Sequence, residues 1–167
     1  MNRTFLWLSL LVVSAGSFAV LLVQTSAIEE HKPPIPARVV DSRGELLFDG
    51  ETIMRGQNVW QSIGGQQIGS IWGHGAYVAP DWTADYLHRE SELVLASLKA
   101  QDPEAGPERD DAHREQLRRM MRNNRYDRAT DTLVLDDERI SALGALEAHY
   151  GRIFREGHGP YAIPAHA

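Results

Sequence analysis

The stretch that decides the fold runs from residue 60 to residue 89 and reads WQSIGGQQIGSIWGHGAYVAPDWTADYLHR. A covalent c-type haem site has the pattern C-x-x-C-H, in which two thiols bind the haem vinyl groups and the histidine ligates the iron. Placed on this stretch, the pattern puts its cysteines at Ser62 and Gly65 and its histidine at Gln66. The spacing suits a haem-attachment loop, but all three chemical groups are absent. The sequence therefore predicts a degenerate haem motif and no haem bound by this chain.

The segments around the motif have the order of a cytochrome c-like helical domain. Residues 51–62 are predicted to form a helix, and a glycine-rich loop follows it. Asp81 is a candidate N-cap for a second helix that runs to about residue 100. We expect apolar and aromatic side chains of the loop to fill the space that a porphyrin would take, namely Ile68, Ile71, Trp72 and Tyr77. A ligand-binding loop is the alternative.

Together with its flanks, this stretch resembles the N-terminal part of the quinol-dependent bacterial nitric oxide reductases. The resemblance covers residues 32–90 most strongly, through the strings WQSIGGQQ and GSIWGHGAYVAPDWT, and extends more weakly over residues 128–160. In that family a haem-free, cytochrome c-like domain is fused to a membrane-embedded catalytic bundle. The resemblance implies that the bundle is the partner of this domain. This chain ends where the family's catalytic helices would begin, so we expect a fragment, a split subunit or a remnant.

The resemblance also implies where the family's cofactors lie. The full enzyme carries haem b, non-haem iron and calcium, all in or against the catalytic bundle. The family's cytochrome-like part reaches the calcium through a loop that matches Gly75 and Tyr77 here, which makes them half of a calcium site that only the bundle completes. No cofactor is assigned to this chain alone, and no catalytic residue.

Composition narrows the functional classes. The net charge of −6 argues against a nucleic-acid partner, which requires a basic surface. The absence of cysteine excludes disulfides, thiolate metal sites and thiol catalysis. Sequence motifs of serine hydrolases, zinc proteases and P-loop enzymes are also absent.

An uncharged apolar run over residues 5–23 predicts a membrane-spanning helix. Arg3 before the run and Glu29 and Glu30 after it favour a cytoplasmic N-terminus and an exported domain anchored in a lipid bilayer. The resemblance implies that this is the bacterial inner membrane, with the domain on its periplasmic or outer face. A cleaved signal peptide is the alternative, because Thr25-Ser26-Ala27 offers small residues for cleavage.

The predicted organisation has four parts. They are an anchor (1–27), a proline-rich linker (28–36), the exported domain (37–160) and a tail that leads to the bundle (161–167). We expect a mainly α fold with a small β hairpin over 37–49, a charged surface helix over 108–123, a short strand over 131–136 and a helix over 137–154.

Three functional interpretations of individual residues remain open from the sequence. Asp81, Asp85 and His88 recur at helical spacing and would suit a divalent metal, although a dipole-stabilised first turn explains them equally well. The arginines after residue 117 would suit anionic lipid, but a solvated helix face is the plainer interpretation; they are Arg118, Arg119, Arg122 and Arg125. His74, between glycines, is either an exposed ligand or part of a tight loop.

The sequence thus predicts the N-terminal structural portion of a membrane nitric oxide reductase, with its chemistry located elsewhere. The alternatives are a stand-alone anchored module that assembles with a separate catalytic subunit, or a truncated product without a function.

Overall fold

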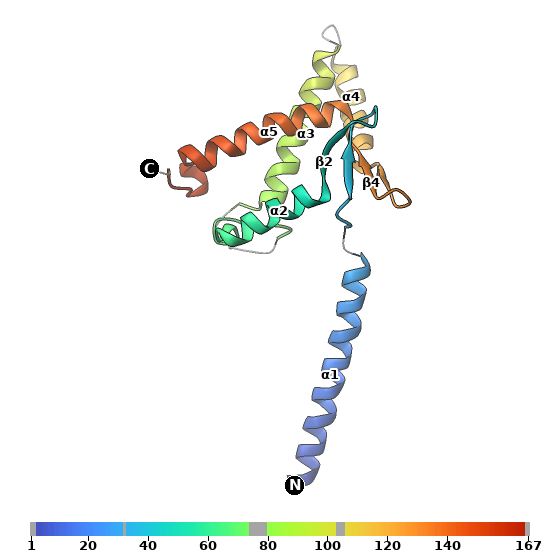
Figure 1. The fold of residues 1–167 in the computed structure, drawn as a ribbon, viewed down its shortest axis with the longest axis vertical. Helices are drawn as coiled ribbons and strands as arrows, with labels where there is room; N and C mark the ends of the chain where they lie inside the picture. Colours follow the sequence, from blue (N-terminus) through green and yellow to red (C-terminus); the bar gives the residue numbers. More distant parts are fainter. Residues whose placement is uncertain (1–2, 32, 74–79, 103–105, 166–167) are drawn as a thin grey trace. The chain divides into compact units, whose positions relative to one another are not determined.

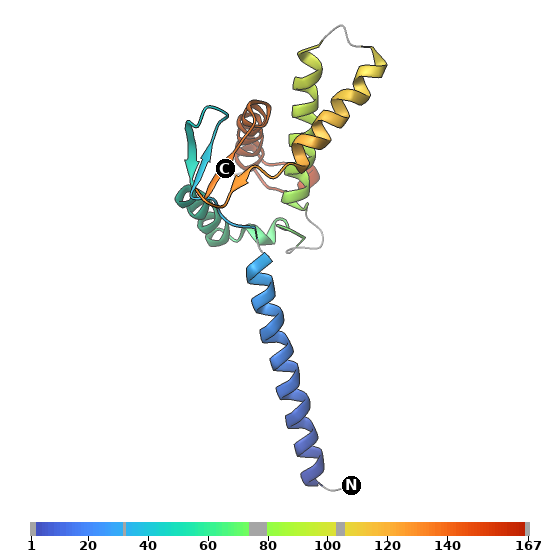
Figure 2. The same ribbon diagram turned by 90° about the vertical axis from the view of Figure 1, so that its right-hand side faces the viewer.

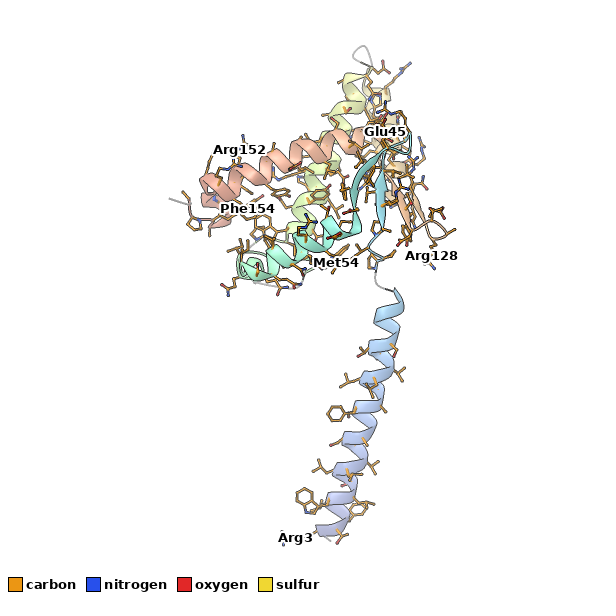
Figure 3. All side chains as sticks on the ribbon, viewed as in Figure 1. Arg3, Glu45, Met54, Arg128, Arg152 and Phe154 are labelled. Atoms are coloured by element: carbon orange, nitrogen blue, oxygen red, sulfur yellow. The ribbon has the colours of Figure 1, made fainter. Side chains whose placement is uncertain are left out.

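The computed structural model describes residues 3–31, 33–73, 80–102 and 106–165. It divides into two compact units, residues 1–35 and residues 36–167. The first unit is a single helix, α1 (Arg3–His31) (Figure 1). Its leucine, valine and phenylalanine side chains are exposed (Figure 3). Its segment Arg3–Ser26 is long and apolar enough to cross a membrane, although a signal sequence passes the same criterion.

The second unit, called the domain below, is mainly helical, as predicted. It contains α2 (Gly50–Ser62), α3 (Trp82–Ala100), α4 (Pro107–Arg122) and α5 (Asp137–Glu156), with two short 3-10 turns, η1 (Gly65–Gln67) and η2 (Gly159–Tyr161) (Figure 1). The predicted helices agree with these bounds to within about two residues. Asp49 and Asp81 supply side-chain caps: each accepts a hydrogen bond from the backbone N–H three residues later, at 2.8 Å in both cases.

The predicted hairpin and the predicted strand within 131–136 are both present, but they belong to one larger sheet. The strands β1 (Arg38–Val40) and β2 (Leu46–Asp49) form that hairpin, with a bulge between Val39 and Val40. The strand β4 (Thr132–Val134) pairs in parallel with β1, and the two-residue β3 (Tyr126–Asp127) pairs antiparallel with β4, which gives the order β2-β1-β4-β3. Only β3 was not predicted, because a two-residue strand carries too little alternation for a sequence pattern to reveal it. The pairing of β4 with β1 was also not predicted, because it joins segments far apart in the sequence.

Two groups of side chains make the helical core, and they differ in chemistry. The aromatic cluster lies around Trp82 between the start of α3 and the end of α5, and consists of Trp60, Trp82, Tyr150, Phe154 and Tyr161, with Ile71, Ile153 and Ile163 packed against it. The aliphatic cluster joins the second half of α3 to α4 and α5, and consists of Val94, Leu98, Leu117, Met120 and Ala142. Figure 2 shows α3 and α4 as an antiparallel pair.

A buried ion pair connects α3 and α5. Glu90 is 1% exposed, and both of its carboxylate oxygens accept hydrogen bonds from Arg139, at 2.7 Å from Nε and 3.2 Å from Nη2. A buried carboxylate is costly without such a partner, so this bidentate pair fixes the register of α3 against α5.

Candidate functional site

The degenerate haem motif lies at the end of α2, and its geometry does not fit a haem attached there. A Cβ on Gly65 would lie 2.2 Å from the Trp60 indole, so a cysteine at this position has no room. The Ser62 hydroxyl donates to the Val59 carbonyl at 2.9 Å, and Gln66 is exposed. Of the three positions that match the haem motif, Ser62 bonds to its own helix and Gln66 is exposed to solvent. At the third, Gly65, the Trp60 indole leaves no room for a side chain.

The Trp82 side chain fills the interior beside this loop. A Cβ on Gly69 would lie 1.8 Å from Trp82 Nε1, so only glycine permits the backbone to approach the indole this closely. The Trp82 ring makes edge or tilted contacts with four aromatic rings, at centroid distances of 6.3 Å to Trp60, 6.1 Å to Tyr150, 5.3 Å to Phe154 and 5.5 Å to Tyr161. Such contacts stabilise beyond simple area burial.

The expectation that loop side chains pack into the interior is confirmed for Ile71 and wrong for Trp72. Ile71 packs on the aromatic cluster, and Ile68 is half-buried. Trp72, however, is 68% exposed and points away from the core. Tyr77 lies outside the described residues. Phe154 and Tyr161 were missed, because only the tertiary fold brings the last turn of α5 and the tail onto α3.

Asp81 holds the loop in front of α3 through both carboxylate oxygens. Oδ1 accepts the capping bond from Ala84 N, while Oδ2 accepts from the Ser70 hydroxyl and from Gly73 N, each at 2.6 Å. The Ser70 hydroxyl, followed by these backbone N–H groups, holds the pKa of Asp81 below its ordinary value. Residues 70–73 are thus fastened to the N-terminus of α3.

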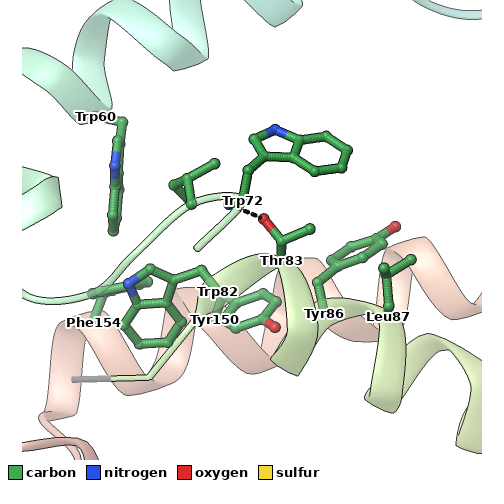
Figure 4. Close-up of a pocket in the computed structure, with 9 residues that line it drawn as sticks. Trp60, Trp72, Trp82, Thr83, Tyr86, Leu87, Tyr150 and Phe154 are labelled. Carbon is green, nitrogen blue, oxygen red and sulfur yellow. Dashed lines mark hydrogen bonds between the residues drawn. The ribbon is translucent and has the colours of Figure 1, made fainter. Parts of the chain in front are cut away.

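This fastening leaves Trp72 in a strained conformation. Its φ of 55° is left-handed, which is uncommon for a bulky residue. Its backbone N–H donates to the Thr83 hydroxyl at 3.0 Å (Figure 4). An indole held outward against a backbone penalty is more often functional than accidental.

A pocket of about 460 Å³ opens beside Trp72. Six of its nine lining residues are aromatic, and Figure 4 shows their rings standing around the opening; the lining consists of Trp60, Ile71, Trp72, Trp82, Thr83, Tyr86, Leu87, Tyr150 and Phe154. Burial raises the pKa of the Tyr86 phenol to about 12, which keeps it neutral. These nine residues offer an apolar surface and no acid–base pair.

Asp85 fastens the tail to α3 from the opposite side of the aromatic cluster. It accepts hydrogen bonds from Tyr161 at 2.6 Å and from Arg89 and Tyr150, both at 2.9 Å. Burial alone would raise the pKa of Asp85, but these three donors outweigh it and lower the pKa below its ordinary value. The charged carboxylate is therefore a structural acceptor here.

The structure does not assemble the suggested metal ligands. Asp81 faces the loop, Asp85 faces the tyrosines, and His88 lies 3.4 Å from Glu92. Over residues 3–31, 33–73, 80–102 and 106–165 there is no group of three His, Asp or Glu side chains that would hold a metal ion. The suggested calcium-site residues Gly75 and Tyr77, and also His74, lie outside the described residues.

Taken together, fold and site define a mainly helical domain whose haem-attachment loop is degenerate and is packed with the protein's own aromatic side chains. Residues 36–167 match the family model for the NorB cytochrome c-like domain of nitric oxide reductase. The match covers most of the chain, which therefore belongs to this family. A search of curated proteins found no match.

Proposed function

We propose that this chain is the N-terminal structural portion of a membrane nitric oxide reductase that uses quinol as its electron donor. In that reaction two NO, two electrons and two protons give N2O and water, and the quinol supplies the electrons and protons as it becomes quinone. The family match over residues 36–167 carries the proposal. The domain takes no part in the chemistry, because its haem motif lacks the thiols and the imidazole.

The role that these observations support is that of a cap on a membrane-embedded catalytic bundle. The bundle is part either of the same polypeptide or of a separate subunit, and it holds the haem b and non-haem iron of the family. By the resemblance, Gly75 and Tyr77 would complete a calcium site against it.

Helix α1 supports a location in the bacterial inner membrane. At 1.5 Å per residue, the 24 residues from Arg3 to Ser26 extend about 36 Å, enough to cross a hydrocarbon core of about 30 Å. Arg3 lies before the apolar segment and two glutamates follow it, which favours a cytoplasmic N-terminus and a periplasmic domain.

A second candidate is a stand-alone anchored module that assembles with a separate catalytic subunit. The domain's two buried clusters favour this candidate, because a domain with its own core can fold apart from its partner.

The size of the protein in native membranes tests the proposal. An antibody against the charged α4 segment 109–122, used on denatured membrane protein, should detect a band several times larger than 18.7 kDa if the domain is one end of a fused reductase. A band near 18.7 kDa that co-purifies with a haem-bearing membrane subunit would identify the stand-alone module. A band of that size without such a subunit would refute the association with a reductase.

A further inference from the structure

A cavity of about 210 Å³ lies where the sheet meets α2, α3 and α5. None of the residues 60–66, which contain the degenerate haem motif, lines it, and it shares a single lining residue, Tyr86, with the aromatic pocket. Its polar wall is formed by Tyr86 and Glu90 of α3 and by Arg139 of α5. We call this space the sheet cavity.

The rest of the wall is mainly apolar. Val39, Phe48 and Leu133 contribute from the sheet, Ile53 from α2 and Leu143 from α5. In the strand ladder Val39 is the partner of both Phe48 and Leu133, so these three side chains lie in a row on one face of the sheet. An apolar cavity of about 150 Å³ admits benzene. The sheet cavity therefore has room for one six-membered ring.

The charged groups of the polar wall retain hydrogen-bonding capacity. The Glu90 carboxylate is buried and accepts one hydrogen bond on each oxygen from Arg139, at 2.7 Å and 3.2 Å. A carboxylate oxygen has two lone pairs, so each can accept one more hydrogen bond. The guanidinium group of Arg139 carries further N–H donors beyond the two that bond to Glu90.

Tyr86 adds a neutral hydroxyl group to this wall. Burial, followed by the negative charge of Glu90, raises the pKa of the Tyr86 phenol to about 12. The hydroxyl group therefore keeps its proton at neutral pH, and it can both donate and accept a hydrogen bond. Within the part of the chain that the structure describes, no residue bonds to it.

The charge balance of the polar wall selects the kind of ligand. Glu90 and Arg139 have opposite formal charges, so their pair favours a neutral ligand over an ion that would lose its hydration. Glu90 accepts hydrogen bonds, Arg139 donates them and Tyr86 does both. A hydroxyl group matches this set, because it also donates and accepts. An apolar lining with a few convergent polar groups is the usual form of a small-molecule site.

We propose that the sheet cavity binds a small, neutral, ring-sized hydroxyl compound of the phenol class. The ring lies among Val39, Leu133 and Leu143, and the hydroxyl group bonds to the polar wall of Glu90 and Tyr86. Water would satisfy the polar wall but would leave the apolar wall without contacts. The site is separate from the proposed quinol chemistry, and it does not depend on a catalytic bundle.

Methyl NMR of the full chain in detergent tests this proposal, with phenol as the probe. The methyl resonances of Ile53, Leu133 and Leu143 should shift saturably as one phenol binds per chain. Leu46 is the matched control, since it is 54% exposed and does not line the cavity. If the lining methyl groups do not shift, or shift no more than those of Leu46, the cavity holds water alone and the proposal is overturned.

Two analogues of phenol test the polar wall. Toluene replaces the hydroxyl group by a methyl group and should bind about tenfold more weakly, because the wall then loses hydration without gaining a hydrogen bond. Benzoate should not bind, because its negative charge would lie beside Glu90. If toluene binds as tightly as phenol, or benzoate binds at all, the assignment to a neutral hydroxyl compound is wrong.

A variant that fills the cavity provides a second readout. Leu143→Phe places a ring in the space that the ligand would occupy and should abolish the phenol-induced shifts of Ile53 and Leu133. Leu93→Phe on the exposed side of α3 is the control and should bind phenol as the wild type does. Urea unfolding checks that both variants fold, and Ile53→Phe replaces Leu143→Phe if the latter does not. Unchanged phenol binding in a folded cavity-filling variant would contradict the proposal.

Discussion

The two core clusters of the domain are made from different side chains: one is aliphatic and the other is mainly aromatic. The aliphatic cluster packs α3, α4 and α5 as in any small helical protein, and charged residues cover its outer surface. The aromatic cluster includes Trp60, which lies two residues before Ser62 of the degenerate haem motif, and the sequence of residues 56–80 contains no Asp, Glu, Lys or Arg. The comparison motivates the hypothesis that indole and phenol rings occupy the interior where a c-type cytochrome would hold its haem.

The largest effect should come from removing the central ring of the aromatic cluster. Trp82 is 6% exposed and contacts four aromatic rings, so Trp82→Ala should lower the free energy of unfolding by about 3–5 kcal/mol. Leu98→Ala in the aliphatic cluster is the comparison, and it should cost less than Trp82→Ala. Urea unfolding of the full chain in detergent, followed by far-UV circular dichroism, measures both. If Trp82→Ala lowers the free energy of unfolding by no more than Leu98→Ala does, the aromatic cluster does not contribute more to stability than the aliphatic cluster.

Adding a single methyl group at the degenerate haem motif should give the next largest loss of stability. Gly65→Ala forces a Cβ against the Trp60 indole and should destabilise the domain by about 1–3 kcal/mol. Gly144→Ala on α5 is the matched control, because its Cβ would meet open space, and it should stabilise the domain by about 0.4–1 kcal/mol. The same urea titration measures both variants. Opposite signs are expected, and a neutral Gly65→Ala would show that the loop is not closed by Trp60.

An effect of similar size, which differs in its pH dependence, should come from the Asp85 carboxylate that accepts hydrogen bonds from Tyr150 and Tyr161. Asp85→Asn should cost about 1–3 kcal/mol at neutral pH, because hydrogen bonds from Arg89, Tyr150 and Tyr161 lose their charged acceptor. The pKa of Asp85 is lowered in the folded state, so its contribution is present above the unfolded value of about 3.9 and is lost as the pH falls through the folded pKa. The stability of the wild type should therefore approach that of the variant at acid pH. A constant difference from pH 7 to pH 2 would contradict the assigned role.

Sequence reasoning identified the helices because their signals are local. The cap Asp81, the apolar spacing of α5 and the glycine-rich loop are each signals contained within a short stretch of the sequence. The degenerate haem motif was visible for the same reason. The composition of the aromatic cluster was not, because Trp60, Trp82 and Tyr161 lie far apart in the chain and only the crossing of α3 and α5 brings them together.

The outward position of Trp72 was also beyond a sequence pattern. A tryptophan between apolar residues predicts burial, and only the hydrogen bonds to Thr83 and Asp81 show why its backbone turns the ring to solvent. Similarly, Asp81 and Asp85 have helical spacing, but whether they hold a metal depends on neighbours from the loop and from α5 that spacing does not reveal.

The most direct test of the replacement of haem by aromatic side chains is a measurement of haem in the purified full chain, produced in haem-replete cells. We expect no pyridine haemochrome absorbance, because Trp60 and Trp82 already fill the space beside the loop. We also expect the same urea unfolding midpoint for protein from haem-deficient cells. About one haem per chain, or a midpoint that falls when haem is withheld, would contradict this replacement.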